Sequence, residues 1–168
     1  HRPLPSGASR VAVSRAADGT WSASFVVDIP VPAPKKLGRP PRVAGVDMGL
    51  TDFATIVYSD GTREKIPNPR FLRSAERSLA RRQQQFSRTQ KGSRNRGKAA
   101  LTVAKSHARV RNLRSNHARQ LASRLTRENQ AVAVETLSIT GLMRTNTAKS
   151  IADAGWGQFL TYLNEAAD

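Results

Sequence analysis

Two short apolar runs, each followed at once by an acid, constrain the fold of this 168-residue chain most strongly. The first run is VAGV at residues 43–46, before Asp47, and the second is AVAV at residues 131–134, before Glu135. Each run is long enough for a central strand, and each gives way to a loop near its acid. The sequence therefore predicts two strands whose ends carry a carboxylate.

The chain between these runs changes its periodicity. Three strand-like segments begin at Arg42, and SDG at residues 59–61 marks a tight turn, so we expect an antiparallel meander. Apolar residues then recur at helical spacing on both sides of QKGSRNRG at residues 90–97, which predicts two helices. With the later AVAV strand, this order indicates an α/β fold with a mixed sheet.

The two ends of the chain add smaller elements. Residues 9–29 alternate apolar and polar side chains around ADGT and predict a β-hairpin, whereas residues 30–41 contain five prolines and predict a linker. A final helix is expected in SIADAGWGQFLTYLNEAA, with Ser150 and Asp153 at the spacing of a capping box. Trp156 is expected to be a packing residue of this helix.

The charge of the chain identifies its class of partner. It has 28 Lys and Arg against 12 Asp and Glu, a formal net charge of +16, which favours nucleic acid or an anionic membrane surface. No apolar run reaches the roughly 18 residues of a membrane span, and there is no signal-peptide pattern. The absence of Cys excludes disulfides and thiolate zinc sites in this chain. We expect an intracellular nucleic-acid protein without a membrane partner.

Most of the positive charge lies in the predicted helical pair. Residues 70–127 hold 17 of the basic residues and one acid, Glu76. Like charges at helical spacing cost a helix about 0.2–0.5 kcal/mol per pair, which favours phosphates as the counter-charge. The alternative is a merely solvated face. Steps of three and four residues predict a stripe on one helix face, formed by Arg70, Arg73, Arg77 and Arg81. The predicted nucleic-acid contacts are Arg70, Arg73, Arg77, Arg81, Arg82, Arg88, Lys91, Arg94, Arg96, Lys98, Lys105 and Arg109.

The two acids suggest a metal site. Ligands bind at the carboxyl ends of strands in α/β sheets, and Mg²⁺ prefers oxygen ligands. On the alternative interpretation Asp47 starts a turn and Glu135 ends a strand. GVDMGLT at residues 45–51 also has the Asp-x-Gly of phosphate loops in actin-like ATPases, although such folds need a second loop and a longer chain. His107 and His117 do not share a helix face and are expected to be phosphate contacts or polar core groups.

Four ordered motifs resemble one family. GVDMGLTDFATIVYSDG with the Arg-rich segment after it, KGSRNRGKAA, AVAVETLSITGL and AKSIADAGWGQFL are similar to the RuvC-like core of TnpB/OrfB transposon proteins, relatives of type V CRISPR effectors. The resemblance covers the chain from about residue 20 to its end. It implies an RNase H-like fold, a guide RNA, a DNA target and cleavage that depends on Mg²⁺ or Mn²⁺.

The resemblance also assigns roles to residues. It implies that Asp47 is the first catalytic acid and metal ligand, and that Glu135 is the second. The Arg-rich helices match the region along the guide–target duplex, and the hairpin at residues 9–29 matches the end of a β-barrel unit. The implied domains are residues 1–29, a linker at 30–41 and a nuclease core at 42–168 with the basic insert 70–127.

The chain departs from the family in two ways. The family's four-cysteine zinc ribbon is not found, because the chain has no Cys, and zinc is therefore not expected. The third catalytic Asp is not found either, because neither Asp153 nor Asp168 fits the third-acid motif. We expect a fragment of a transposon-associated RNA-guided endonuclease of the prokaryotic cytoplasm and nucleoid, and whether it is an active enzyme stays open. The alternative is a protein that binds nucleic acid without cutting it; an ATP-binding enzyme is a distant third.

Overall fold

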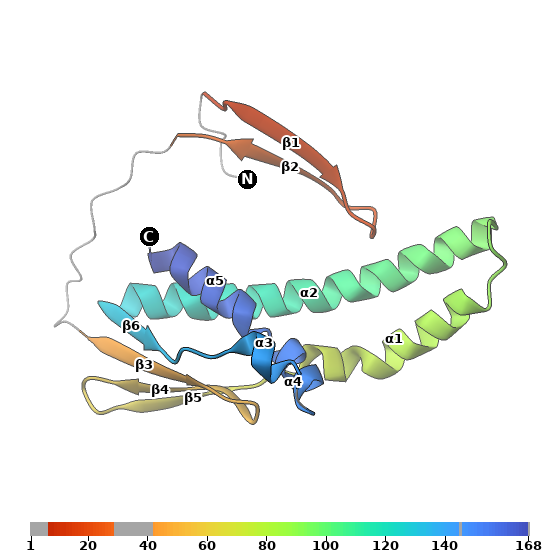
Figure 1. Cartoon of the computed structure of the whole chain (residues 1–168). Coiled ribbons are helices and arrows are strands. Elements are labelled where there is room, and N and C mark those ends of the chain that lie inside the picture. The colour runs from red at the N-terminus through yellow and green to blue at the C-terminus, as the bar shows by residue number, and fades with distance from the viewer. Residues whose placement is uncertain (1–6, 29–41, 145, 168) are drawn as a thin grey trace. The chain divides into compact units, whose positions relative to one another are not determined.

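The computed structural model describes residues 7–28, 42–144 and 146–167 (Figure 1). The chain divides into two compact units. One combines His1–Lys36 with Leu79–Ala108, and the other combines Leu37–Ser78 with Arg109–Asp168. The predicted linker at residues 30–41 lies outside the described residues, so the domain boundaries at its two ends stay predictions. No helix among the described residues has the length and apolar character needed to cross a membrane.

The first unit contains the predicted hairpin. Strands β1 (Arg10–Arg15) and β2 (Trp21–Val26) pair antiparallel, which confirms the hairpin. Its turn depends on Gly19, whose φ of 85° is unfavourable for other residues, and on the N–H of Thr20, which donates to Asp18 Oδ1 at 3.0 Å. The two strands form a sheet of their own within the described chain, and the β-barrel stays a prediction.

Two long helices confirm the predicted helical pair. Helix α1 (Phe71–Ser87) and helix α2 (Arg94–Glu128) are joined by a short connection. The predicted break at residues 90–97 was placed too late, because α2 already begins at Arg94. The N-terminal cap explains this difference: Ser93 Oγ accepts a hydrogen bond from the N–H of Arg96 at 3.1 Å.

The connection between α1 and α2 is held by one arginine. The guanidinium of Arg96 lies over the ring of Phe86, 4.3 Å from its centroid, and donates to the carbonyl oxygen of Thr89 at 3.0 Å. Arg96 is half-buried as a result. This side chain therefore has a structural role at the end of the helical pair.

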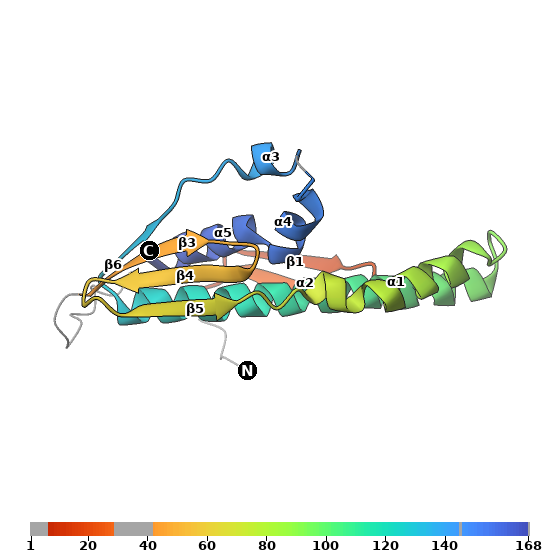
Figure 2. The same cartoon turned by 90° about the horizontal axis from the view of Figure 1, so that it is seen from below.

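The second unit contains the mixed sheet. Strands β3 (Val43–Met48), β4 (Asp52–Tyr58) and β5 (Arg63–Pro67) form the predicted antiparallel meander, and β6 (Ala131–Val134) pairs parallel with β3. The strand order is β5-β4-β3-β6 (Figure 2). A mixed α/β fold is therefore confirmed. Parallel neighbours need a long crossover connection, and the helical pair lies between β5 and β6 in the chain.

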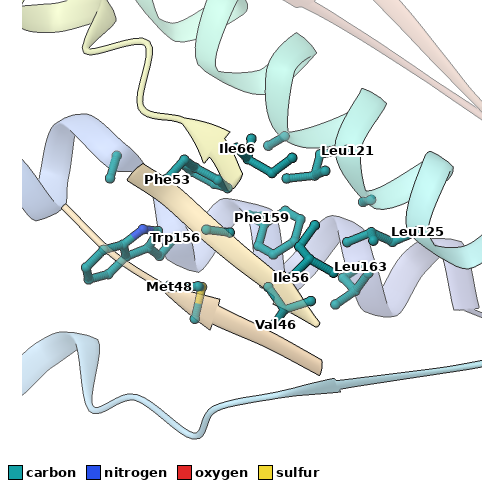
Figure 3. Packing of buried hydrophobic residues seen from close by; sticks show 14 of the residues in the cluster. Val46, Met48, Phe53, Ile56, Ile66, Leu121, Leu125, Trp156, Phe159 and Leu163 are labelled. Atoms are coloured by element: carbon teal, nitrogen blue, oxygen red, sulfur yellow. The ribbon is translucent and has the colours of Figure 1, made fainter. Parts of the chain in front are cut away.

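One face of this sheet carries the hydrophobic core. Val46, Ile56 and Phe53 from the strands lie against Leu125 of α2 and Phe159 of the last helix (Figure 3). Phe53 and Phe159 form an edge-to-face pair with ring centroids 5.5 Å apart. The core therefore fixes the face of β3, where alternate side chains must point away from it. In β4 a register irregularity between Asp52 and Ala54 lets Phe53 join Ile56 in the core.

The predicted last helix is two helices. After α3 (Ile139–Leu142), helix α4 (Ala148–Ala154) ends at Gly155 and α5 (Trp156–Ala167) follows. Gly155 has a φ of 73°, a left-handed conformation that ends α4. The capping-box prediction was wrong, because Ser150 and Asp153 lie inside α4. Trp156 is 4% exposed, which confirms it as a packing residue.

Candidate metal site and nucleic-acid interface

Asp47 lies on the face of the sheet opposite the core. Along β3 the side chains of Ala44, Val46 and Met48 are buried, whereas Asp47 is exposed. It is the second-last residue of β3 and therefore lies at the carboxyl end of a strand, as the sequence predicted.

Glu135 lies at the end of the neighbouring strand. The register of β3 and β6 runs to the pair Val46 and Val134, and the next residue along each strand is the acid. Parallel strands end at the same edge of a sheet, so both acids belong to this edge. The exposed Glu135 begins the segment that leads from β6 to α3 (Figure 2). The predicted adjacency of the two strands is confirmed, whereas a metal held between the acids stays a proposal.

The donor set at this edge is compatible with magnesium. Asp47 and Glu135 supply carboxylate oxygens, and Mg²⁺ is commonly held by one or two carboxylates while it keeps several waters. In the part of the chain that the structure describes, no group of three or more His, Cys, Asp or Glu could hold a metal ion. Asp47 and Glu135 therefore offer two carboxylate ligands to a metal ion at this edge.

The turn after Asp47 is tied to its surroundings through the backbone. A Cβ on Gly49 would lie 3.0 Å from the carbonyl oxygen of Asp52, so the tight turn itself favours glycine here. Asn68 Nδ2 donates to the carbonyl oxygen of Leu50 at 3.0 Å. This hydrogen bond joins the turn between β3 and β4 to the segment that leads from β5 into α1.

Asp153 has a structural role that its local sequence did not indicate. Its Oδ1 accepts the N–H of Leu72 at 2.7 Å, and its Oδ2 accepts the N–H of Arg73 at 3.0 Å. Asp153 is 7% exposed and thus caps the N-terminus of α1 from a distant part of the chain. Asp168 lies outside the described residues.

The predicted arginine stripe is helical from Arg73 onward. Arg73, Arg77 and Arg81 lie on α1 and are exposed. Arg70 is also exposed, but it precedes the helix and has a φ of 45°, which is unusual for a residue other than glycine. The prediction that Arg70 shares the helix face was therefore wrong, because α1 begins at Phe71.

The first unit holds the most uniformly basic part of the helical pair, which we call the tip segment, residues 79–108. It contains eight Lys and Arg and no Asp or Glu. Arg96 is half-buried, whereas the other seven are exposed; Arg82 also donates to Ser106 Oγ. Arg109, the remaining predicted contact, follows in the second unit and is exposed. The eight residues are Arg81, Arg82, Arg88, Lys91, Arg94, Arg96, Lys98 and Lys105.

The two helical histidines have different surroundings. His107 is exposed, with Nε2 3.4 Å from Gln83 Nε2. His117 is half-buried and packs edge-on against Phe53 and Phe71, at centroid distances of 5.0 and 6.1 Å. Burial lowers the pKa of His117 below its ordinary value of 6.5. His117 is therefore a polar core group.

Comparisons with known proteins agree with the motifs. Residues 24–146 match the family described as "OrfB_IS605: Probable transposase". A Streptomyces pristinaespiralis protein named "Putative RNA-guided DNA endonuclease" is 39% identical over 166 residues, which are 96% of this chain and 39% of that protein. A Mycobacterium tuberculosis protein of the same description is 34% identical over 146 residues, 85% of this chain and 32% of its own length.

A solved structure is also similar. A chain in the cryo-EM structure of a CRISPR-Cas12f ternary complex has a TM-score of 0.47 and 15% sequence identity, covering 94% of this chain and 33% of that one. This chain thus spans well under half the length of the curated relatives and of that structure. Because the family match extends over residues 24–146, most of the sequence, the chain belongs to the OrfB family of IS605-type transposon proteins, the TnpB/OrfB family that its motifs resemble.

Proposed function

We propose that this chain is the RuvC-like, RNase H-like core of an RNA-guided DNA endonuclease, with Asp47 and Glu135 as its first two catalytic acids. The observation that carries the proposal is the parallel pairing of β3 with β6, which ends one residue before each acid. The names of the two curated relatives support the same activity.

Asp47 and Glu135 would hold Mg²⁺ or Mn²⁺ through their carboxylate oxygens. The bound ion supplies positive charge that stabilises the oxygens of a phosphodiester during hydrolysis. Asp47 projects from the open face of β3, where no core side chain competes for its oxygens. The turn held by Gly49 and Asn68 supports the strand end that carries this acid.

The basic helices would hold the guide RNA and the target DNA through their phosphates. The tip segment presents exposed cations without any acid to neutralise them. Contacts of this kind are independent of base sequence and weaken with salt, because phosphate neutralisation releases counterions. Sequence would then be read by pairing between the guide and its target.

A second function, binding without cleavage, is favoured by one observation. The described residues contain no group of three metal-ligating side chains, and Asp153 is used as the cap of α1. Two carboxylates leave a two-metal site short of ligands. We therefore expect the 168-residue chain to bind nucleic acid and to cut it poorly by itself.

A segment exchange tests the catalytic proposal. The corresponding segment of the Streptomyces relative is replaced by this chain, and plasmid cleavage is measured with the relative's guide RNA and Mg²⁺. We expect cleavage by the hybrid, a loss of several orders of magnitude in Asp47→Ala and Glu135→Ala, and full activity in Glu165→Ala, an exposed acid on α5. Undiminished cleavage by Asp47→Ala would exclude that residue as a catalytic acid. Efficient cutting by the 168-residue chain alone would contradict the expected lack of ligands.

A further inference from the structure

The tip segment contains a cavity between its two helices, and most of the residues that line it are polar. Its volume is about 380 Å³. One side is lined by Arg82, Gln85 and Thr89, and the other by Asn95, Lys98, Ala99 and Thr102. This volume lies in the range of small-molecule sites, about 300–1,000 Å³, and far exceeds the space of a single water. No Asp or Glu lines the cavity, so no negative charge there repels an anionic ligand.

The cavity offers two kinds of polar group. The side-chain amides of Gln85 and Asn95 are exposed and make no hydrogen bond within the described part of the protein, which leaves their donors and acceptors available. The hydroxyls of Thr89 and Thr102 instead donate to the carbonyl oxygens of Phe86 and Lys98, at 2.6 and 3.0 Å. The amides are therefore the groups best able to read the polar edge of a ligand.

One cation of the cavity wall is held in place from within the protein. Arg82 donates to Ser106 Oγ, and that hydroxyl donates to the carbonyl oxygen of Thr102 at 2.8 Å. Ser106 is 8% exposed, so the group that Arg82 donates to is sheltered from water, although Arg82 itself is exposed. A guanidinium fixed in this way loses less conformational entropy on binding a phosphate than a solvated lysine does.

We propose that this cavity binds one unpaired nucleotide of a nucleic-acid strand. Arg82 and Lys98 contact its phosphate, and Gln85 and Asn95 hydrogen-bond to the edge of its base. The combination explains the observations better than a phosphate alone, which needs neither this volume nor two free amides. Proteins read unpaired bases through hydrogen bonds to such edges. The inference rests on the proposed function, in which the tip segment binds nucleic acid.

The test compares matched labelled duplexes by fluorescence anisotropy with the 168-residue chain. One RNA duplex is fully paired, one carries a single bulged nucleotide, and one carries an abasic bulge; DNA duplexes of the same design identify which type of strand supplies the nucleotide. We expect wild type to bind the bulged duplex about tenfold more tightly than the paired or abasic duplex, which is the discrimination typical of one good contact between a side-chain amide and a base edge.

Two variants localise the effect. Ala99→Phe fills the cavity without changing charge, with Ala80→Phe on the exposed side of α1 as its control. Gln85→Glu alters one cavity amide with little change of shape, and the exposed Gln84→Glu is its matched control. We expect both cavity variants to lose the preference for the bulged duplex, and both controls to keep it. Ala99→Phe should bind the paired duplex as wild type does.

The outcomes separate the two proposals. Equal binding of all three duplexes by wild type, or a preference that survives in Ala99→Phe and Gln85→Glu, overturns the nucleotide site and leaves backbone binding by the basic helices intact. A chain that binds no duplex at low salt contradicts the proposed function as well. Thermal unfolding of each variant shows whether a lost preference for the bulged duplex comes from misfolding. If one cavity variant is misfolded, the other still tests the nucleotide site.

Discussion

Val46 and Val134 are register partners in the parallel pairing of β3 with β6, and each is followed directly by an acid. The relationship depends on the helical pair, because α1 and α2 form part of the connection that carries the chain from β5, on one side of the sheet, to β6 on the other side. The basic helices thus lie within the crossover that places the strand before Glu135 beside the strand of Asp47. The basic helices and the pair of acids both enter the proposed function.

The cap of α1 by Asp153 predicts a specific loss of stability. Asp153→Ala leaves the N–H groups of Leu72 and Arg73 without their acceptors, and we expect a cost of about 2 kcal/mol. Asp153→Asn keeps one side-chain oxygen and should lose less. Urea unfolding measures both, with the exposed Glu165→Ala as the control. Equal stability of Asp153→Ala and wild type would show that the cap contributes nothing.

The burial of His117 predicts a pH dependence of stability. Its folded-state pKa is lowered, so as pH falls below 6.5 the unfolded chain takes up a proton before the folded chain does. The unfolded state then binds more protons, and the free energy of unfolding decreases as pH falls from about 7.5 to about 5.5.

His117→Phe keeps a ring between Phe53 and Phe71 and removes the titrating group. We expect the free energy of unfolding of this variant to depend less on pH over the same range. His107→Phe, at an exposed position, should retain the wild-type dependence. Identical pH profiles for wild type and His117→Phe would contradict the assignment to His117.

The exposed cations of the tip segment predict binding that depends on salt but not on sequence. Replacing Arg81, Arg88 and Arg94 by Gln should weaken duplex binding about equally for unrelated sequences and reduce the slope of log K against log salt by about 2–3. The matched triple replacement by Lys keeps the charge and should keep the slope. Titrations between about 50 and 200 mM salt measure both. A loss confined to one sequence would instead indicate base contacts.

Local signals explain which parts of the fold could be predicted. Asp-Gly turns and alternating side chains specify the hairpin and the meander, and helical periodicity specifies α1 and α2. The motifs at Asp47 and Glu135 correctly predict two neighbouring strands, since both acids follow apolar runs that pair in the sheet.

Contacts between distant residues explain what the sequence did not reveal. Ser150 and Asp153 have the local spacing of a capping box, but Asp153 caps α1, whose first residues are 80 positions away or more. The left-handed Gly155 divides a segment whose apolar pattern is continuous. The cavity of the tip segment could not be predicted either, because its lining comes from two helices and their connection.

The central claim is that Asp47 and Glu135 form one metal site, and Mn²⁺ binding to the 168-residue chain tests it most directly. Electron paramagnetic resonance measures free and bound Mn²⁺ for wild type, Asp47→Asn, Glu135→Gln and the double variant, with Glu165→Gln as the control. A shared site predicts that each single variant loses as much binding as the double variant does, because the acids act together on one ion. Binding that survives in the double variant, or losses that add as for independent sites, would contradict the account.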